Sequence, residues 1–420
     1  MRRGLVMGSC CIALVAALTA GLMSPLEPRP ARAEPAARGV MKLVSRGVNA
    51  TRIKIGLHAP ITGASPVASD SVERGKDLFF RWLESQGRSI HGRDVEVVLR
   101  NDQFNPSTAV SVCREMVEEE KVFLLMGFQG VDQMQACARY AASKGVPYVS
   151  PGSTRIVLNQ LDNYFAASKT YRGEGRLLAD FFITKLRARN RENGVVYYDS
   201  PNWRQGRDAF SAEMERRGAE IAYDRTVPVG AGASEAQLVV QEMKLAGIQN
   251  VFIIGRPVWF MNVLKQADAQ DFFPQWTGIS TMPANDAVAN VSCRGGNSLD
   301  GARFLSPYPA VVDSDRFDPR FRKAVTKLHP QSTPDDYMWH LWALQRVVGK
   351  MLDGTGKDLT ATRFIRRTER RDRLATGILP TLRYSPSDHF GARDAHLLKA
   401  RCADRKWHTV RSFVHDFKRR

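Results

Sequence analysis

Residues 121–154, "KVFLLMGFQGVDQMQACARYAASKGVPYVSPGST", contain the pattern from which the fold class is predicted. Short apolar runs at 122–126 and 146–149 flank a segment whose apolar residues recur at helical spacing. A strand, a helix and a second strand in succession predict two parallel strands joined by a crossover helix. The second strand runs into "SPGST", residues 150–154, which brings hydroxyls and backbone amides to the edge of the sheet where α/β proteins bind ligands.

The same alternation continues on both sides of this stretch. Before it, the sequence predicts strands at 52–60 and 93–102 and helices at 71–87 and 105–120, the last with Asn105 as cap and Pro106 in the first turn. After it, the pattern restarts, with helices predicted at 173–189, 205–218, 234–247 and 259–270 and strands at 194–199, 220–228, 250–255 and 273–280. Two similar α/β halves are expected, each a mostly parallel sheet covered on both faces.

The remaining chain holds too few elements for a third domain. Helices are predicted at 334–352 and 360–371, and a pair of strands within 396–413. A chain of 420 residues exceeds the roughly 250–300 residues at which a single core stops growing. The sequence therefore predicts two domains, completed by these last elements.

The first 33 residues have the three parts of a secretory signal peptide. Arg2 and Arg3 precede an apolar run at 5–23, and "ARA", residues 31–33, offers a cleavage site. Cleavage would release a protein that begins near Glu34, with a flexible leader at 34–50, outside the cytoplasm. A retained membrane anchor is the alternative, but the run is short and contains Gly, Ser and Thr.

Composition and motifs exclude several other functions. The chain is 43% hydrophobic and 25% charged, as soluble globular proteins are, with a net charge of +18, or +15 without residues 1–33 (57 basic minus 42 acidic). That charge favours anionic surfaces, but no nucleic-acid-binding motif is present, and the basic run at 363–373 is typical of a solvated helix face. No GxSxG, HExxH, P-loop or Cys/His cluster is present, so neither an enzyme nor a metal or cofactor site is expected.

Together these segments resemble the type I periplasmic solute-binding proteins of ABC importers, specifically the branched-chain amino acid-binding (Leu/Ile/Val) type. The resemblance covers about residues 51–415 and rests on the order of "IKIGLHAPITG", "GVPYVSPGST", "GVVYYDSPNWRQGRDAF" and "NVFIIGRPVWFMNVLKQA". It implies two lobes joined by three crossover strands. The two lobes are expected to close on a ligand by hinge bending. Lobe I is expected at 51–168 and 306–375, and lobe II at 169–305 and 376–420.

The resemblance places a ligand site between the lobes. On lobe I it implies Gly130, the last residue of "MGFQG", with Val131 and Asp132 after it, and Gly152, Ser153 and Thr154 of "SPGST". On lobe II it implies Trp203, Arg256 and Ser280. Thr154 matches the family's ammonium-binding threonine, whereas Val131, Trp203, Arg256 and Ser280 replace its carboxylate-binding serine, two tyrosines and ammonium-neutralising acid.

These departures bear on the ligand. A buried ammonium without a counter-charge costs several kcal/mol, so a standard α-amino acid is not expected. Arg256 can bind a carboxylate through two hydrogen bonds. Trp203 can form an apolar surface against a ring or chain of the ligand. The alternatives are a surface arginine at a helix start for Arg256, core packing for Trp203, and helix capping for Asp132 and Thr154.

Four cysteines remain after residue 33. Outside the cytoplasm an even number suggests disulfides, although four buried free thiols are the alternative. With the lobe assignment that the resemblance implies, we expect Cys113 to pair with Cys137 and Cys293 with Cys402, so that each bridge stays within one lobe. The expected partners are a small-molecule ligand and the membrane permease of an importer, or a membrane signalling protein if the chain is a sensor; the chain is expected to be a monomer that binds no nucleic acid.

Overall fold

The computed structural model describes residues 45–188, 192–280 and 285–417. The predicted signal peptide, residues 1–33, and positions 34–44 of the predicted leader lie outside the described residues. Within the described ranges, every helix is too short or too polar to cross a membrane.

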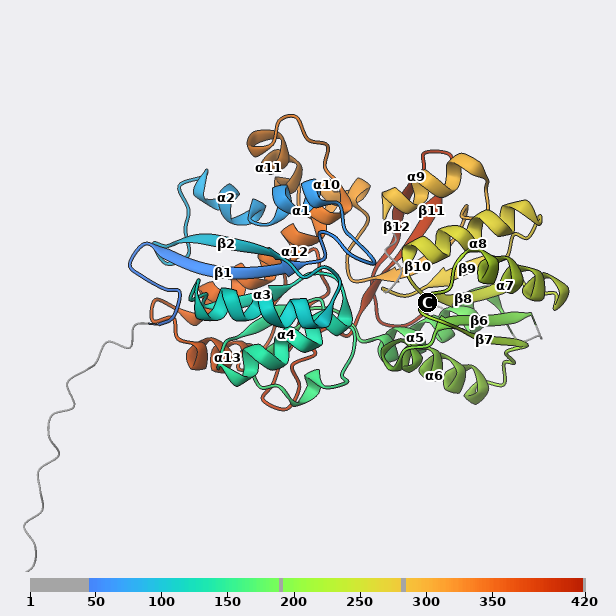
Figure 1. Cartoon of the computed structure of the whole chain (residues 1–420), viewed down its shortest axis with the longest axis horizontal. Helices are drawn as coiled ribbons and strands as arrows, with labels where there is room; N and C mark the ends of the chain where they lie inside the picture. Colours follow the sequence, from blue (N-terminus) through green and yellow to red (C-terminus); the bar gives the residue numbers. More distant parts are fainter. Residues whose placement is uncertain (1–44, 189–191, 281–284, 418–420) are drawn as a thin grey trace, which may run out of the picture. The chain divides into compact units, whose positions relative to one another are not determined.

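Five parallel strands form the first sheet, in the order β2-β1-β3-β4-β5. Figure 1 shows β1 and β2 side by side in this sheet. The strands are β1 (Arg52–Ala59), β2 (Asp94–Asn101), β3 (Leu124–Gly127), β4 (Tyr148–Ser150) and β5 (Tyr164–Ala166). Successive side chains along a strand point to opposite faces of the sheet. In β3, for example, Leu124 and Met126 belong to one hydrophobic core and Leu125 to the other. Both faces of the sheet are thus covered, as its unbroken apolar runs predict.

Helices cover the two faces of this sheet unequally. One face packs on α3 (Pro106–Glu118) and α4 (Val131–Ser143). The other face packs on a larger set: α1 (Ser69–Gly75), α2 (Leu78–Glu84), α11 (Arg320–Leu328), α12 (Asp336–Thr355) and α13 (Ala361–Glu369). Along the chain, the 3-10 turn η1 (Leu158–Gln160) connects β4 to β5, and the 3-10 turn η3 (Val311–Asp313) and the short α10 (Ser314–Phe317) precede α11. This sheet and its helices are called the first lobe.

Seven strands form the second sheet, in the order β12-β11-β10-β9-β8-β6-β7. Five are parallel: β6 (Asn193–Tyr198), β7 (Tyr223–Val227), β8 (Asn250–Ile254), β9 (Gln275–Gly278) and β10 (Arg303–Ser306). The last two, β11 (Ala395–Arg401) and β12 (Lys406–Val414), add an antiparallel edge.

Helices also cover both faces of the second sheet. They are α5 (Tyr171–Phe181, followed by a π turn at Phe182–Leu186) and α6 (Pro201–Arg216) on one face, and α7 (Ala233–Leu245), α8 (Pro257–Ala269) and α9 (Asp286–Gly295) on the other. This unit is the second lobe. The expected α/β fold with two doubly wound, mostly parallel sheets is confirmed.

The chain passes between the cores of the two lobes three times. These crossings lie between Ala167 and Tyr171, between Leu305 and Tyr308, and between Ala392 and Ala395. Ile378, Leu382 and Tyr384 belong to the core of the first lobe, although the sequence analysis assigned 376–420 to lobe II. From these cores, we propose that the last boundary lies near residue 393.

One predicted helix is split in two. The sequence predicts a single helix over 71–87, but the structure has α1 and α2, with a break after Gly75. A Cβ on Gly75 would lie 3.1 Å from the Met338 Cα of α12, so the two helices approach closely there. Gln345, also on α12, completes the break: its Nε2 donates to the Gly75 carbonyl at 2.6 Å and its Oε1 accepts from the Phe79 N–H at 2.9 Å.

Two disulfides hold these layers. Cys113 of α3 is bonded to Cys137 of α4, 24 residues along the chain, and Cys293 of α9 to Cys402, 109 residues along. Each bridge lies within one lobe. The predicted pairing is therefore confirmed, and the alternative of four free thiols is wrong.

Candidate functional site

A cavity of about 570 Å³ is lined by side chains from both lobes. The first lobe contributes residues 65–67, 104, 129–134, 151, 153, 337 and 340, and the second lobe 199–203, 229, 256–258, 261, 280, 285, 287, 288 and 291. The crossings contribute residues 168, 171 and 306–308. The wall is mostly apolar, and Val258 and Val291, which line it, are 58% and 59% exposed. A volume of this size suits a small organic molecule.

Several helices begin at this cavity. Residues at or next to the first turns of α4, α6, α8 and α9 line it, because each helix follows the carboxyl end of a strand or lies beside one. The first N–H groups of a helix have no partner within the helix, and the helix dipole favours negative charge at that end. α6 and α8 begin with Pro201 and Pro257, which have no N–H. The Asp286 and Val288 N–H groups of α9 already donate to the side chains of Asp336 and Asn285. The helix dipoles, more than free N–H groups, therefore favour an oxygen-rich or anionic group in the ligand.

Seven of the nine predicted site residues line the cavity. They are Gly130, Val131, Asp132, Ser153, Trp203, Arg256 and Ser280. Gly130 is in the N-cap position of α4 with φ +78°, and a Cβ there would lie 2.4 Å from the Gln133 Oε1. A glycine is thus needed for the chain to turn from β3 into α4 beside the cavity.

Gly152 and Thr154 lie behind the wall rather than in it. Gly152 has φ +63°, and its carbonyl accepts a hydrogen bond from the Ser168 hydroxyl at 2.8 Å. Thr154 is fully buried, and its Oγ1 accepts from the Ile156 N–H at 3.2 Å. Of "SPGST", Pro151 and Ser153 face the cavity.

Trp203 and Arg256 meet at Tyr198. The Trp203 ring lies 5.2 Å from the Tyr198 ring, and the Arg256 guanidinium lies 5.6 Å from the same ring. Trp203 also packs against both cores of the second lobe, so it serves in packing as well as in the wall. Arg256 is in the N-cap position of α8, and its guanidinium donates to the carbonyls of Val229 and Ala64.

Ser280 is joined to a buried acid. Its hydroxyl donates to Glu174 Oε1 and its backbone N–H to Glu174 Oε2. Glu174 is fully buried and does not line the cavity. Burial raises the pKa of Glu174 to about 8, although the hydrogen bonds from Ser280 and the charge of Lys169 lower it. The carboxyl is therefore neutral near pH 7 and supplies no counter-charge for an ammonium group.

Asp132 is the acid that reaches the cavity from the first lobe. It lies in the first turn of α4, but its side chain accepts from Asn202 Nδ2 at 2.9 Å instead of capping the helix. Burial raises its pKa, and the hydrogen bond from Asn202 opposes this effect.

Five ring side chains of the wall were not among the predicted site residues: Phe104, Tyr171, Tyr308, Tyr337 and His340. Tyr308 follows β10, and Tyr337 and His340 lie three residues apart on α12. A signal for Tyr308 exists in the sequence, because "LSPYP" at 305–309 repeats the strand-Ser-Pro pattern of "VSPGS" at 149–153. Tyr337 and His340 lie within an apolar helical pattern, which predicts packing in a hydrophobic core and not contact with a ligand.

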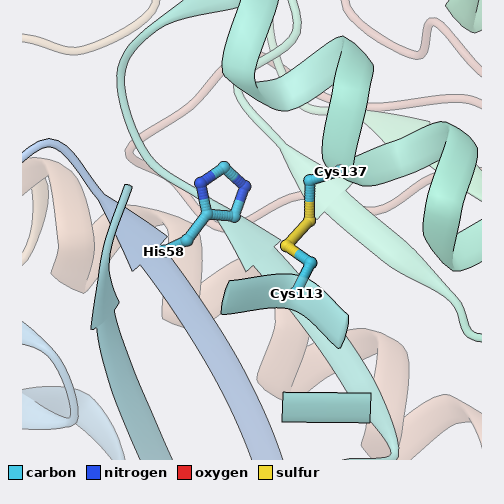
Figure 2. Close-up of side chains that lie close together, drawn as sticks. All are labelled: His58, Cys113 and Cys137. Atoms are coloured by element: carbon cyan, nitrogen blue, oxygen red, sulfur yellow. A yellow bond between two sulfur atoms is a disulfide. The ribbon is translucent and has the colours of Figure 1, made fainter. Parts of the chain in front are cut away.

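A second polar cluster lies inside the first lobe. His58 Nδ1 is 2.7 Å from Asp102 Oδ2 and its Nε2 is 2.6 Å from the Tyr148 hydroxyl. Figure 2 shows the His58 ring beside the disulfide of Cys113 and Cys137. These sulfurs are bonded to each other and both ring nitrogens have partners, so the group offers no free metal ligand. His58, Asp102 and Tyr148 are fully buried away from the cavity, so this chain of hydrogen bonds is structural.

A family model described as "Periplasmic binding protein" matches residues 52–406. The chain belongs to the periplasmic binding protein family. A curated relative, "Leu/Ile/Val-binding protein homolog 3" of Brucella melitensis, is 24% identical over 207 residues, which are 48% of this chain and 54% of that protein. The chain thus spans about half the length of the curated relatives it matches.

Solved members of this fold match nearly the whole chain. The "Fatty acid ABC transporter substrate-binding protein" from Thermomonospora curvata has a TM-score of 0.76 at 15% identity, covering 89% of this chain and 94% of its own. The solute-binding protein of an ABC transporter from Rhodopseudomonas palustris, in complex with 3,4-dihydroxybenzoic acid, has a TM-score of 0.70 at 17% identity, covering 86% and 96%. These likenesses establish the two-lobe fold of this periplasmic binding protein.

Proposed function

We propose that this chain is the extracytoplasmic receptor of an ABC importer for a small organic solute with an acidic or amide-like group and an apolar part. The solute binds in the cavity, and the lobes close on it about the three crossings. The observation that carries the proposal is the cavity itself, whose wall is mostly apolar and where several helices begin.

The polar groups of the wall favour an acid or amide over an α-amino acid. The positive ends of the helix dipoles at the cavity, together with the Arg256 guanidinium, suit a carboxylate or carbonyl oxygen. Where an acid is expected to neutralise an ammonium group, Ser280 stands, and Glu174 behind it is held neutral by burial. One of the two structural relatives above is named for fatty acids, and the other is in complex with 3,4-dihydroxybenzoic acid. Both ligands are carboxylic acids, which supports the same ligand class.

An amino acid receptor is the second candidate. The names of the curated relatives favour it, and so does Asp132, whose carboxyl lines the cavity and offers one negative charge. Calorimetry separates the two candidates. If the chain is an amino acid receptor, leucine, isoleucine and valine should bind and organic acids should not.

The receptor role also implies export and a membrane partner. We infer that the chain is cleaved after residue 33 and released outside the cytoplasm. We also infer that it acts as a monomer and catalyses no reaction. N-terminal sequencing that finds Met1 would contradict the cleavage. A pull-down from the host that recovers a membrane kinase instead of a permease would favour a sensor.

Arg256 provides the direct test of the acid-binding role. Native mass spectrometry of protein purified from its host identifies the retained solute, and calorimetry then measures its affinity. Arg256 is half-buried, and a hydrogen bond to a charged group contributes about 1.5–3 kcal/mol, so Arg256→Ala should weaken acid binding by about that amount. Arg207→Ala is the matched control, since Arg207 pairs with Asp224 in the same lobe and does not line the cavity. Tight binding of leucine, and of no organic acid, would refute the proposal.

A further inference from the structure

Two polar rings stand without partners in the wall of the cavity. His340 is 8% exposed and Tyr308 is 5% exposed, and both line the cavity. Within the ranges that the structure describes, the His340 Nδ1 and the Tyr308 hydroxyl are enclosed and have no hydrogen-bond partner. The rings stack on each other, with centroids 4.0 Å apart and planes inclined by 19°. They come from α12 and from the segment after β10, so the fold brings them together at the cavity.

Other buried phenols of the first lobe are satisfied. The Tyr384 hydroxyl donates to the Ala166 carbonyl at 3.1 Å, and the Tyr164 hydroxyl is paired with the Ser150 hydroxyl at 2.9 Å. Neither tyrosine lines the cavity. Buried polar groups in native proteins nearly always have a partner, because an unsatisfied one is costly. Eleven other buried side-chain atoms of the described residues also lack a partner, but none of their residues lines the cavity. Tyr308 and His340 do line it, so a partner for this pair can enter through the cavity.

The chemistry of the pair limits what that partner can be. Burial lowers the pKa of His340 to about 3, so the imidazole is neutral and offers one donor and one acceptor. Burial also raises the pKa of Tyr308, so its phenol keeps its proton. A half-turn of the imidazole about χ2 exchanges Nδ1 with Cδ2, so the ring can present either atom toward the cavity. A neutral pair of this kind matches a hydroxyl, which donates and accepts, better than a second carboxylate, which only accepts and would bring a buried charge.

We propose that Tyr308 and His340 form a subsite for a neutral hydroxyl group of the ligand. This rests on the proposed function and deepens it: the solute carries one acidic or amide-like group, an apolar body and a hydroxyl away from the acid. Tyr337, three residues before His340 on α12, also lines the cavity.

The test compares acids that differ by one group. Calorimetry on the full chain measures benzoate against 4-hydroxybenzoate, hexanoate against 6-hydroxyhexanoate, and terephthalate as the acid with a second charge. Since a satisfied hydrogen bond contributes about 0.5–1.5 kcal/mol, the hydroxy acid of at least one pair should bind about 2–12-fold more tightly than its parent, and terephthalate more weakly than either benzoate. In Tyr308→Phe and His340→Phe this ratio should fall toward 1.

A thermal-shift measurement on the ligand-free variants separates binding from structure. Removing an unsatisfied polar atom leaves the ligand-free protein as stable or more stable, so Tyr308→Phe should not lower its melting temperature. Tyr384→Phe is the control: it breaks a satisfied hydrogen bond, so it should lower the melting temperature and leave the ligand ratio unchanged.

The outcomes also separate this inference from the proposed function. Equal binding within both pairs, or a ratio unchanged in both cavity variants, overturns the hydroxyl subsite while the acid receptor stands. Binding of none of the five acids overturns the proposed ligand class, and the subsite with it.

Discussion

Asn202 of the second lobe donates through its Nδ2 to Asp132 Oδ1 of the first lobe at 2.9 Å. The Asn202 Oδ1 also accepts from Gln135 Nε2 at 3.2 Å, and Gln135 donates in turn to the Ile156 carbonyl at 2.9 Å. Asn202 is only 6% exposed. These hydrogen bonds join α4 to α6 beside the cavity, so they stabilise an arrangement in which the lobes are in contact.

Replacing Asn202 by alanine should therefore favour separation of the lobes. Each lost hydrogen bond contributes about 0.5–1.5 kcal/mol, which is enough to change the population of a two-state hinge several-fold. Small-angle scattering of the ligand-free variant should give a larger radius of gyration, and calorimetry a weaker affinity. Asn159→Ala is the control. Asn159 lies on the surface, and its hydrogen bond with Arg155 stays within the first lobe. An unchanged radius and affinity would show that these contacts do not hold the lobes.

Glu174→Gln should remove part of the pH dependence of stability. Burial raises the pKa of Glu174 from 4.5 to about 8, so the folded protein keeps this proton at pH values where the unfolded chain has lost it. The stability that this proton linkage contributes is full below pH 4.5 and is lost as the pH rises through 8. Chemical unfolding should show the wild type losing roughly 2–4 kcal/mol relative to Glu174→Gln between pH 5 and pH 8.

Glutamine can still accept from Ser280, so the two proteins differ in the titrating group and little else. Curves that stay parallel over this pH range would mean that Glu174 is not held neutral. In that case the carboxylate would be charged beside Ser280, and the argument against an α-amino acid ligand would weaken.

The sequence predicted the layers well because hydrophobic periodicity is a local property. Runs such as 250–255 alternate between two cores in the structure, and the helices between them begin within a few residues of their predicted starts. Shorter or more polar elements were missed, namely β5, β10, α9, α10 and α11. The break between α1 and α2 was also missed, since it depends on Gln345 and Met338, which lie far along the chain.

The site was predicted less completely because local sequence does not show which way a loop faces. The "SPGST" loop was expected to present Gly152 and Thr154, yet both face inward while Ser153 lines the cavity. Conversely, Tyr308 and His340 lie 32 residues apart and meet only through the packing of α12 on the crossing after β10. Only the tertiary structure reveals that pair.

Gln345→Leu should destabilise the first lobe. It leaves the Gly75 carbonyl and the Phe79 N–H without partners in a site where Gln345 itself is fully buried. Each unsatisfied buried group costs about 1–3 kcal/mol, so the free energy of unfolding should fall by roughly 2–6 kcal/mol in urea denaturation. Gln86→Leu is the control, as Gln86 is an exposed residue of the same region whose amide contacts only Ser85. A change below about 0.5 kcal/mol would show that the helix break does not depend on Gln345.

The two disulfides should differ in how fast they are reduced in the folded protein. Cys113 and Cys137 are fully buried between α3 and α4, whereas Cys293 and Cys402 are partly exposed at the edge of the second lobe. Thiolate attack needs access to a sulfur atom, so mild dithiothreitol should open Cys293–Cys402 first. Alkylation followed by peptide mass spectrometry should then find label on these two cysteines long before Cys113 and Cys137. In denaturant the order should disappear, because all four sulfurs are then equally accessible.

Once opened, the Cys293–Cys402 bridge no longer closes a loop of 109 residues, and the gain in loop entropy of the unfolded chain should lower the stability by about 4–5 kcal/mol. The native protein reduced at this bridge alone should therefore unfold at lower denaturant, and simultaneous labelling of both pairs would contradict the difference in burial.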